Sequence, residues 1–415
     1  MQLRGRRPGA PFRTVRRLAT TPRVGQTPAS RAITRRVLIA AINPQPQTLE
    51  VMLGDRGLVA TLDWDWLIDR ARVHRIAALV AARLRDAPGG LPEAVVAQFD
   101  EIREQAAQRA AAAQHTLREL AAGLRSRGVP FLLVKGSVLA ELVYGDPDIR
   151  PFYDVDVIVP RESLAAAELL LRSWHYRMEG VWSLLGRRPP PPIAIDRAEA
   201  IAHHTYLRVF HNLSYAPARG DARRPVELHW NIVPRGRLRV RAEQLWRRTT
   251  TVHVAGVEVQ TLDAEAMLIH LAVHALEAWF HGFKLLHLND VAWTVSRRVG
   301  QYRDLWELAG VWGAAYHLEL ALRLVDWLSP VPAAAALLAG RRPSLWMRTA
   351  LRVAGRETIL VDGRVERGAT PPESWARRSA VELSWGLAVR GMRAKLGFSL
   401  ARRVAAAQWR LAHRG

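Results

Sequence analysis

The sequence predicts an α+β protein in which a mixed α/β centre is flanked by helical regions on both sides. Apolar residues recur at helical spacing from about residue 31 to residue 127. Short apolar runs bounded by turn residues replace this pattern between residues 130 and 262, and helical spacing returns from Asp263. The chain of 415 residues is long enough for two or three domains with sizeable cores.

The chain divides into five expected parts. They are a disordered basic tail (1–30), an N-terminal helical region (31–128), an α/β core (129–262), a C-terminal helical domain (263–345) and a basic amphipathic helical tail (346–415). A start codon assigned too early and a transit peptide stay open as origins of the first part, because it is rich in arginine and free of acids.

Basic residues gather at the two ends of the chain. Lys and Arg number 60 against 38 Asp and Glu, which is a net charge of +22. Residues 1–45 hold ten arginines and no acid, residues 375–415 carry a net charge of +8, and the remainder carries only +4. This distribution argues against nucleic acid as the partner. The chain has no cysteine, which excludes disulfides and thiolate metal sites, and we expect a cytoplasmic protein.

The N-terminal helical region contains two clear helix signals. Asp63 is placed to cap a helix that starts at Trp64. Residues 94–127 are rich in Ala, Gln and Arg and predict one long helix, which Gly128 and Pro130 end.

The centre alternates strands and helices. Residues 130–135 and 154–159 predict strands, and residues 137–144 predict a helix between them. A further helix is expected from Glu162 to Trp174, with its leucines at 164, 169 and 171 turned inward.

Four further strands, two of them in a hairpin, and two helical stretches complete the expected fold. Residues 204–210 and 226–232 predict strands, and a hairpin is expected around Ala255-Gly256. Helices follow from Asp263, and residues 374–413 predict a basic amphipathic helix. That helix could pack on the body, lie on an anionic membrane surface or contact a polyanion.

Two aspartates, Asp154 and Asp156, are the strongest chemical signal. Residues i and i+2 of a strand point to the same face, so both carboxylates would meet at one place. Two carboxylates held together repel each other unless a cation lies between them. Paired carboxylates and substrate phosphates suit Mg²⁺, so this spacing predicts a two-metal magnesium site.

A second signal precedes the aspartates. Lys135-Gly136-Ser137 ends one apolar run and begins a helix, where backbone N–H groups can bind phosphate. Lys135 is one of three lysines in a chain that otherwise uses arginine, and its ammonium could bind a phosphate as a point charge. Together the two motifs predict a site for a metal-bound nucleoside triphosphate.

A third carboxylate is expected from the strand at residues 226–232. Glu227 and His229 share one face of it, and Glu227 could complete a metal site or act as a base. His229 could line the nucleotide site or be a structural histidine. For Glu227, the alternative is a surface residue of an edge strand.

Other polar residues have competing interpretations. Arg150 could bind a phosphate, brace the aspartates or form an ion pair in a turn. His270 and His274 are four residues apart on one helix face, which can bind metal, but no third ligand is evident and helix packing is favoured. Asp290 is expected to be a structural hydrogen-bonding residue.

These motifs resemble the uncharacterised nucleotidyltransferase family, a branch of the DNA polymerase beta-like nucleotidyltransferase superfamily, over residues 32–300. The residues that carry the resemblance are Lys135-Gly136-Ser137, Tyr144, Arg150-Pro151, Asp154-Val155-Asp156, Glu227-Leu228-His229-Trp230, His270, His274 and Asp290. The third carboxylate is Glu where compact members of the superfamily have Asp. The gap from Ser137 to Asp154 is longer than in those members but fits this branch.

The resemblance implies a polymerase-beta-like core with a small mixed sheet, and Mg²⁺-dependent nucleotidyl transfer from a nucleoside triphosphate. It names no acceptor, and a small molecule, sugar or peptide is expected. Two other functions stay open. One is a nucleotide-binding regulatory module without catalysis. The other is a protein that binds polyanions or membrane surfaces through its basic tails.

Overall fold

The computed structural model describes residues 28–87, 90–179, 207, 210–234, 236–277, 284–298 and 300–354. The expected basic tail at the N-terminus, up to residue 27, and the expected amphipathic helix over 374–413 lie outside these residues. Most of the strand expected over 204–210 also lies outside them. The division into domains therefore stays a prediction.

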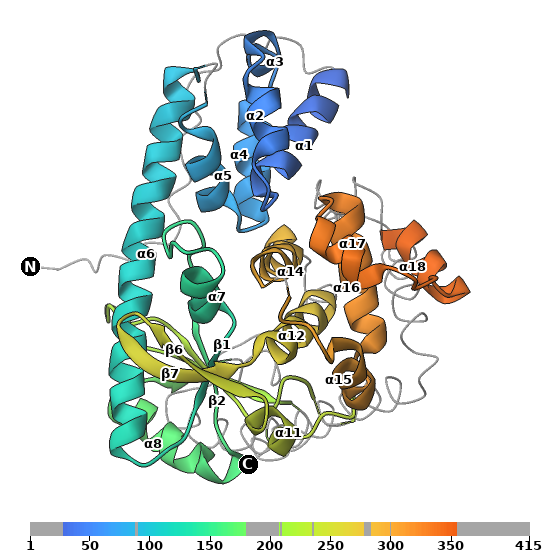
Figure 1. Cartoon of the computed structure of the whole chain (residues 1–415). Coiled ribbons are helices and arrows are strands. Elements are labelled where there is room, and N and C mark those ends of the chain that lie inside the picture. The colour runs from blue at the N-terminus through green and yellow to red at the C-terminus, as the bar shows by residue number, and fades with distance from the viewer. Residues whose placement is uncertain are drawn as a thin grey trace, which may run out of the picture.

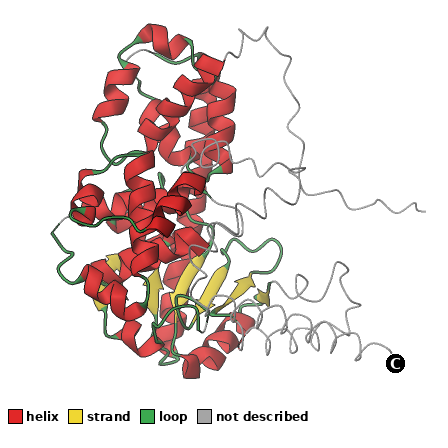
Figure 2. Cartoon of the chain, turned by 90° about the vertical axis from the view of Figure 1, so that its right-hand side faces the viewer, coloured by secondary structure: helices red, strands yellow, loops and turns green. Residues whose placement is uncertain are grey.

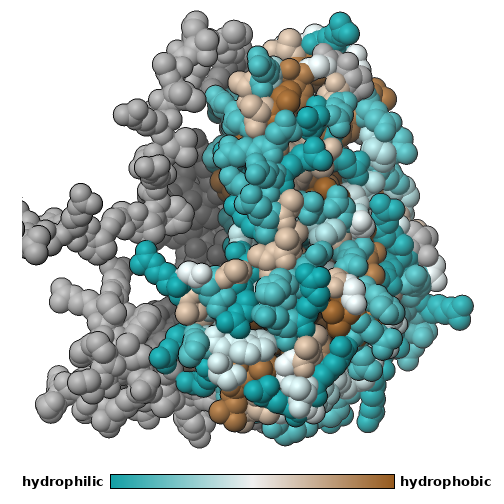
Figure 3. Space-filling view, turned by 90° about the vertical axis from the view of Figure 1, so that its left-hand side faces the viewer, coloured by the Kyte–Doolittle hydropathy of each residue, from teal (hydrophilic) through white to brown (hydrophobic). Residues whose placement is uncertain are grey.

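Six helices form the N-terminal part of the described chain (Figure 1). They are α1 (Pro28–Ile42), α2 (Gln47–Leu53), α3 (Arg56–Ala60), α4 (Trp64–Val73), α5 (Ala77–Leu84) and α6 (Glu93–Ser126). Asp63 caps α4, because its carboxylate accepts a hydrogen bond from the Trp66 amide, as predicted. The long helix α6 runs beside both the other N-terminal helices and the sheet. Hydrophilic residues predominate on the face of the molecule over α6 (Figure 3).

The strands of the described chain form one mixed sheet, in the order β3-β4-β5-β2-β1-β7-β6. They are β1 (Leu132–Val134), β2 (Val155–Ile158), β3 (Arg177–Met178), β4 (Asn212–Ala216), β5 (Val226–His229), β6 (Thr249–Val254) and β7 (Val257–Leu262). Strand β2 pairs antiparallel with β1 and parallel with β5. Figure 2 shows the strands gathered at one end of the molecule, with helices above and around them.

The hairpin of β6 and β7 turns at Ala255-Gly256, as predicted. Both residues have positive φ, 53° and 75°, and Val254 pairs with Val257. Two residues of positive φ match the right-handed twist of the strands they join, and Gly adopts this conformation without steric cost.

Three short α-helices lie between the strands in the described part of the chain. They are α7 (Gly136–Leu142), α8 (Leu164–Ser173) and α11 (Ala242–Trp246). The prediction that Leu169 faces inward is wrong, because its side chain is 66% exposed and Leu170 is buried instead. Leu164 and Leu171 are buried as expected, seven residues apart on one face, and Leu169 lies five residues after Leu164 on another.

The last described part of the chain is helical. Its helices are α12 (Ala264–Glu277), α14 (Leu285–Arg297), α15 (Leu305–Trp312), α16 (Ala315–Leu328), α17 (Pro332–Leu338) and α18 (Leu345–Ala354). Helices α12, α14 and α16 pack on one another, and α12 also contacts β7. The α+β prediction with helical flanks is thereby confirmed. Within the described residues, no helix has the length and apolar character needed to cross a membrane.

Candidate active site

Neighbouring strands bring the expected site residues to one end of the sheet. Asp156 on β2 pairs in register with Glu227 on β5, so both side chains leave the same face. Asp156 also pairs with Val134, the residue before Lys135, and this places the lysine beside the two carboxylates. Asp154 directly precedes β2, which begins one residue later than predicted.

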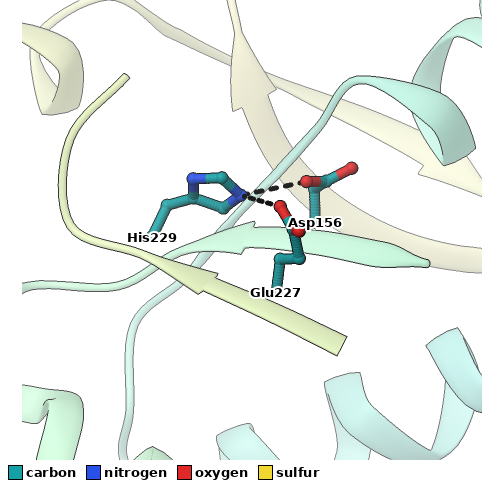
Figure 4. Close-up of side chains that lie close together, drawn as sticks. All are labelled: Asp156, Glu227 and His229. Atoms are coloured by element: carbon teal, nitrogen blue, oxygen red, sulfur yellow. Dashed lines mark hydrogen bonds and ion pairs between the residues drawn. The ribbon is translucent and has the colours of Figure 1, made fainter. Parts of the chain in front are cut away.

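Asp156, Glu227 and His229 form a tight cluster (Figure 4). The Nε2 atom of His229 lies 2.9 Å from Asp156 Oδ1 and 3.2 Å from Glu227 Oε2. Asp156 and His229 are buried, and Glu227 is partly buried. Burial and the charge of Lys135 oppose protonation of His229, but the two hydrogen bonds outweigh them and raise its pKa.

Lys135 supplies a positive charge to the same cluster. Its ammonium donates to Asp156 Oδ1 at 2.6 Å and lies 3.8 Å from Glu227 Oε2. Burial lowers the pKa of Lys135, but the charges of Asp156 and Glu227 outweigh burial and hold that pKa above its usual value. Lys135 also has φ 54° and ψ −122°, a backbone conformation that residues other than glycine rarely adopt and that costs about 1–3 kcal/mol. Such strain is commonest at functional sites.

Neighbouring negative charges act on the Asp154 carboxyl, as its spacing from Asp156 predicts. Burial, followed by the charges of Asp156 and Glu227, raises the pKa of Asp154 to about 7. Lys135 and Arg150 oppose this rise. Asp154 therefore holds its proton more strongly than a free carboxyl, and a divalent cation at the cluster would favour its ionised form.

Two residues that hydrogen-bond to Glu227, Ser214 and Asn212, were not among the site residues predicted from the sequence. Ser214 Oγ donates to Glu227 Oε1 at 3.0 Å, and Asn212 Nδ2 donates to Oε2 at 3.3 Å. Both come from β4, on which Asn212 and Ser214 alternate with buried Leu213. Burial raises the pKa of Glu227, but the His229 bond and the Lys135 charge together hold it well below its usual value. The alternation on β4 is a signal that could have identified both residues.

Gly136 and Ser137 lie at the start of α7, as predicted. A Cβ on Gly136 would lie 2.7 Å from Phe152 Cβ and 3.0 Å from an Arg150 nitrogen, so only glycine fits here. The Ser137 hydroxyl is buried and has no hydrogen-bond partner in the described structure. It is therefore available to a ligand.

Arg150 is held in a buried network rather than pointing free into the site. Its guanidinium donates to both carboxylate oxygens of Asp290 on α14, at 3.1 and 2.6 Å. Tyr144 donates to the same carboxylate at 3.0 Å, accepts from Asn289 and stacks on Trp293. Of the three roles expected of Arg150, the geometry shows an ion pair, although its partner lies on α14 and not in the same turn. Phosphate binding and bracing of the aspartates by Arg150 stay predictions, and Asp290 has the structural role expected of it.

The histidines of α12 and α14 lie side by side. The rings of His270 and His274 are 6.3 Å apart, and His274 meets His287 edge-on at 4.9 Å. Burial, followed by the charge of Lys135, lowers the pKa of His270 and of His274 well below the usual value. Neither histidine belongs to a metal-ligating group among the described residues. Helix packing remains the better explanation of their spacing.

The donor set of the cluster fits a divalent cation. One ligand atom from each of Asp156, Glu227 and His229 lies within 4.8 Å of the others. Carboxylate oxygens suit Mg²⁺ and Mn²⁺, whereas imidazole suits softer metals. Asp154, the other aspartate expected to bind metal, is not a member of this group among the described residues.

A family model described as Uncharacterised nucleotidyltransferase matches residues 60–330, more than half of the chain. This span includes the whole cluster and the strands that carry it. Neither the curated proteins nor the solved structures contain a match to the chain.

Proposed function

Because this chain belongs to the uncharacterised nucleotidyltransferase family, we propose that it transfers a nucleoside monophosphate from a nucleoside triphosphate to a hydroxyl-bearing acceptor. The observation that carries this proposal is the meeting of Asp156, Glu227 and Lys135 at one end of the sheet. The acceptor is a small molecule, sugar or peptide rather than nucleic acid, since the body of the chain is nearly neutral.

Three carboxylates hold the metal in this proposal. Asp154 and Asp156 bind Mg²⁺, and Glu227 joins them from the neighbouring strand. When bound, the metal stabilises charge at the reacting phosphate and acidifies the acceptor hydroxyl. Ser214 and His229 fix the orientation of Glu227, which favours loss of the hydroxyl proton.

The loop before α7 holds the departing phosphates. Lys135 moves from Asp156 toward the β- and γ-phosphates, and the Gly136 and Ser137 amides and the Ser137 hydroxyl donate to them. The acceptor oxygen bonds to the α-phosphorus as the bond to the β-phosphate oxygen breaks, and pyrophosphate leaves. Positioning and charge neutralisation account for most of such catalysis.

Calorimetric titration of MgATP, MgGTP, MgCTP and MgUTP tests this proposal. The wild type should bind at least one of them, and Asp156→Asn should lose that binding. Glu258→Gln is the matched control, because Glu258 is an exposed carboxylate on β7 of the same sheet. No binding by the wild type would contradict the proposal.

Two further outcomes separate the rival functions. Binding of a nucleotide without pyrophosphate release, with any acceptor from a small-molecule, sugar and peptide panel, would favour a regulatory module. A chain lacking residues 1–30 and 375–415 should keep its nucleotide binding if the protein is an enzyme. A protein that acts through its basic tails would instead lose its partner.

A further inference from the structure

Three arginines surround the exposed ring of Tyr153, the residue directly before Asp154. The guanidinium carbons of Arg75, Arg109 and Arg224 lie 5.2, 5.7 and 5.9 Å from the centre of that ring. Since they share this centre, no two of them are more than 11.6 Å apart. The Tyr153 side chain is 39% exposed, so the cluster is open to solvent.

These arginines come from three separate elements of the fold. Arg75 lies in the turn between α4 and α5, Arg109 on α6, and Arg224 just before β5. Arg75 has φ 60° at the position after a helix end where glycine is usual, a backbone conformation that is strained for an arginine. The fold therefore tolerates a strained backbone at Arg75, the residue whose guanidinium lies over the Tyr153 ring.

None of the three guanidinium groups pairs with a carboxylate in the described part of the chain. Other arginines of this protein do, for example Arg150 with Asp290 and Arg223 with Asp221. Among the described residues, Arg109 donates only to the neutral Gln105 side chain. The buried Nε atom of Arg224 has no hydrogen-bond partner there either, which is unfavourable unless a ligand or water satisfies it.

An excess of arginine in the whole chain does not explain this arrangement. A general excess would place unpaired arginines over the surface, where each is separately solvated. Here three of them converge on one ring beside the proposed catalytic aspartates. Cation–π contacts with the Tyr153 ring attract each guanidinium group and keep the three together before a ligand binds.

The cluster and the loop proposed to hold the nucleotide phosphates contact different residues of the same segment. Phe152 and Arg150 pack against Gly136, whereas Tyr153 faces Arg109 of α6. The Tyr153 cluster and the loop before α7 lie at the same end of the sheet, because Val155 pairs in register with Val226 and Val134 with Asp156. A ligand at Tyr153 would therefore lie next to Asp154, at the same end of the sheet as the loop proposed to hold the nucleotide.

We propose that Arg75, Arg109 and Arg224 bind a phosphate group on the acceptor of the transfer reaction. Guanidinium groups bind phosphate through paired N–H donors, and three of them match the charge and the several oxygens of a phosphate monoester. This assignment to the acceptor rests on the proposed nucleotidyl transfer. The acceptor then presents a hydroxyl to Asp154 and Glu227 while its phosphate is anchored at Tyr153.

Titration of inorganic phosphate into the metal-free full-length chain, followed by calorimetry, tests the anion site by itself. The wild type should bind phosphate, and Arg109→Gln/Arg224→Gln should bind it at least about tenfold more weakly, the loss expected for charged hydrogen bonds. Arg103→Gln is the matched control, because Arg103 is exposed on the same helix. Equal phosphate binding by the double variant and the wild type, or none by the wild type, would overturn the site.

A second titration distinguishes the acceptor from the nucleotide. Binding of the nucleoside triphosphate with Mg²⁺ should be unchanged in Arg109→Gln/Arg224→Gln and lost in Asp156→Asn. Weaker nucleotide binding in the arginine variant would overturn the assignment to the acceptor and place the triphosphate at Tyr153. Failure of the proposed function would show instead as wild-type protein that binds no nucleotide. If the double variant does not fold, Arg109→Gln and Tyr153→Leu take its place.

Discussion

The ammonium of Lys135 donates to the carboxylate of Asp156, with Nζ 2.6 Å from Oδ1. The lysine follows β1 and the aspartate lies on the adjacent β2, so the bond joins two strand ends at the centre of the sheet. A metal ion at the cluster needs the oxygen that Lys135 now contacts. Under the proposed function, Lys135 would therefore compete with the metal for this oxygen until a nucleotide phosphate is bound.

Replacement of Lys135 should tighten metal binding in the absence of nucleotide. Lys135→Gln removes the competing charge, and we expect Mn²⁺ to bind at least about tenfold more tightly, equivalent to about 1.4 kcal/mol. Calorimetry or electron paramagnetic resonance of Mn²⁺ measures this change. Lys284→Gln, at the start of α14, is the control and should bind Mn²⁺ as the wild type does. Weaker Mn²⁺ binding by Lys135→Gln would show that the lysine does not compete with the metal.

Loss of the Asp290 carboxylate should destabilise the protein severely. Asp290→Asn leaves the buried Arg150 guanidinium without its partner, which costs about 3–5 kcal/mol. Urea denaturation measures the free energy of unfolding. Asp100→Asn breaks the exposed Arg85 pair and should cost far less. Equal losses in the two variants would mean that the buried pair contributes no more than a surface pair.

A methyl group at Gly136 should disturb the loop that holds the phosphates. Gly136→Ala would bring its Cβ to 2.7 Å from Phe152, and overpacking of this kind costs about 1–3 kcal/mol. Nucleotide binding should weaken with it. Gly310→Ala, on α15 with open space around its Cβ, should instead stabilise the protein by up to about 1 kcal/mol. Thermal and urea unfolding should show a loss of stability for Gly136→Ala and a gain for Gly310→Ala.

Acid should destabilise the helical region through His317. Burial, with the charge of Arg237 adding to it, lowers the pKa of His317 to about 3. The unfolded chain binds a proton on this histidine below its usual pKa of about 6.5, whereas the folded chain does not until about pH 3. Stability is therefore lost as pH falls from about 6.5 toward 3, by about 2 kcal/mol at pH 5 for this group.

His317→Gln should remove that part of the pH dependence. Urea denaturation at pH 7.5 and pH 5 measures the loss in each protein, and the variant should lose about 2 kcal/mol less than the wild type. An identical loss in both would show that His317 is protonated in the folded state at pH 5.

Patterns between near neighbours in the chain were predictable from the sequence. The capping of α4 by Asp63, the turn at Ala255-Gly256 and the long helix α6 follow from residues within a few positions of one another. The shared face of Glu227 and His229 follows from strand alternation in the same way. The shared face of Asp154 and Asp156 stays a prediction, because Asp154 lies just before β2. Leu169 was mispredicted because the helical pattern of α8 allows more than one apolar face.

Long-range partners were not predictable, since they depend on strand order and helix packing. Ser214 and Asn212 support Glu227 only because β4 pairs with β5 in that register. Arg150 finds Asp290 across 140 residues of chain.

By itself, the sequence determined the α+β class, the helix caps and turns, and the residue types of the site, because each depends on local spacing and backbone preference. The tertiary structure alone decided which charges meet. It set Lys135 at positive φ against Asp156, and it brought Arg75, Arg109 and Arg224 to Tyr153. Burial and strand pairing select these neighbours from many that the same composition would allow.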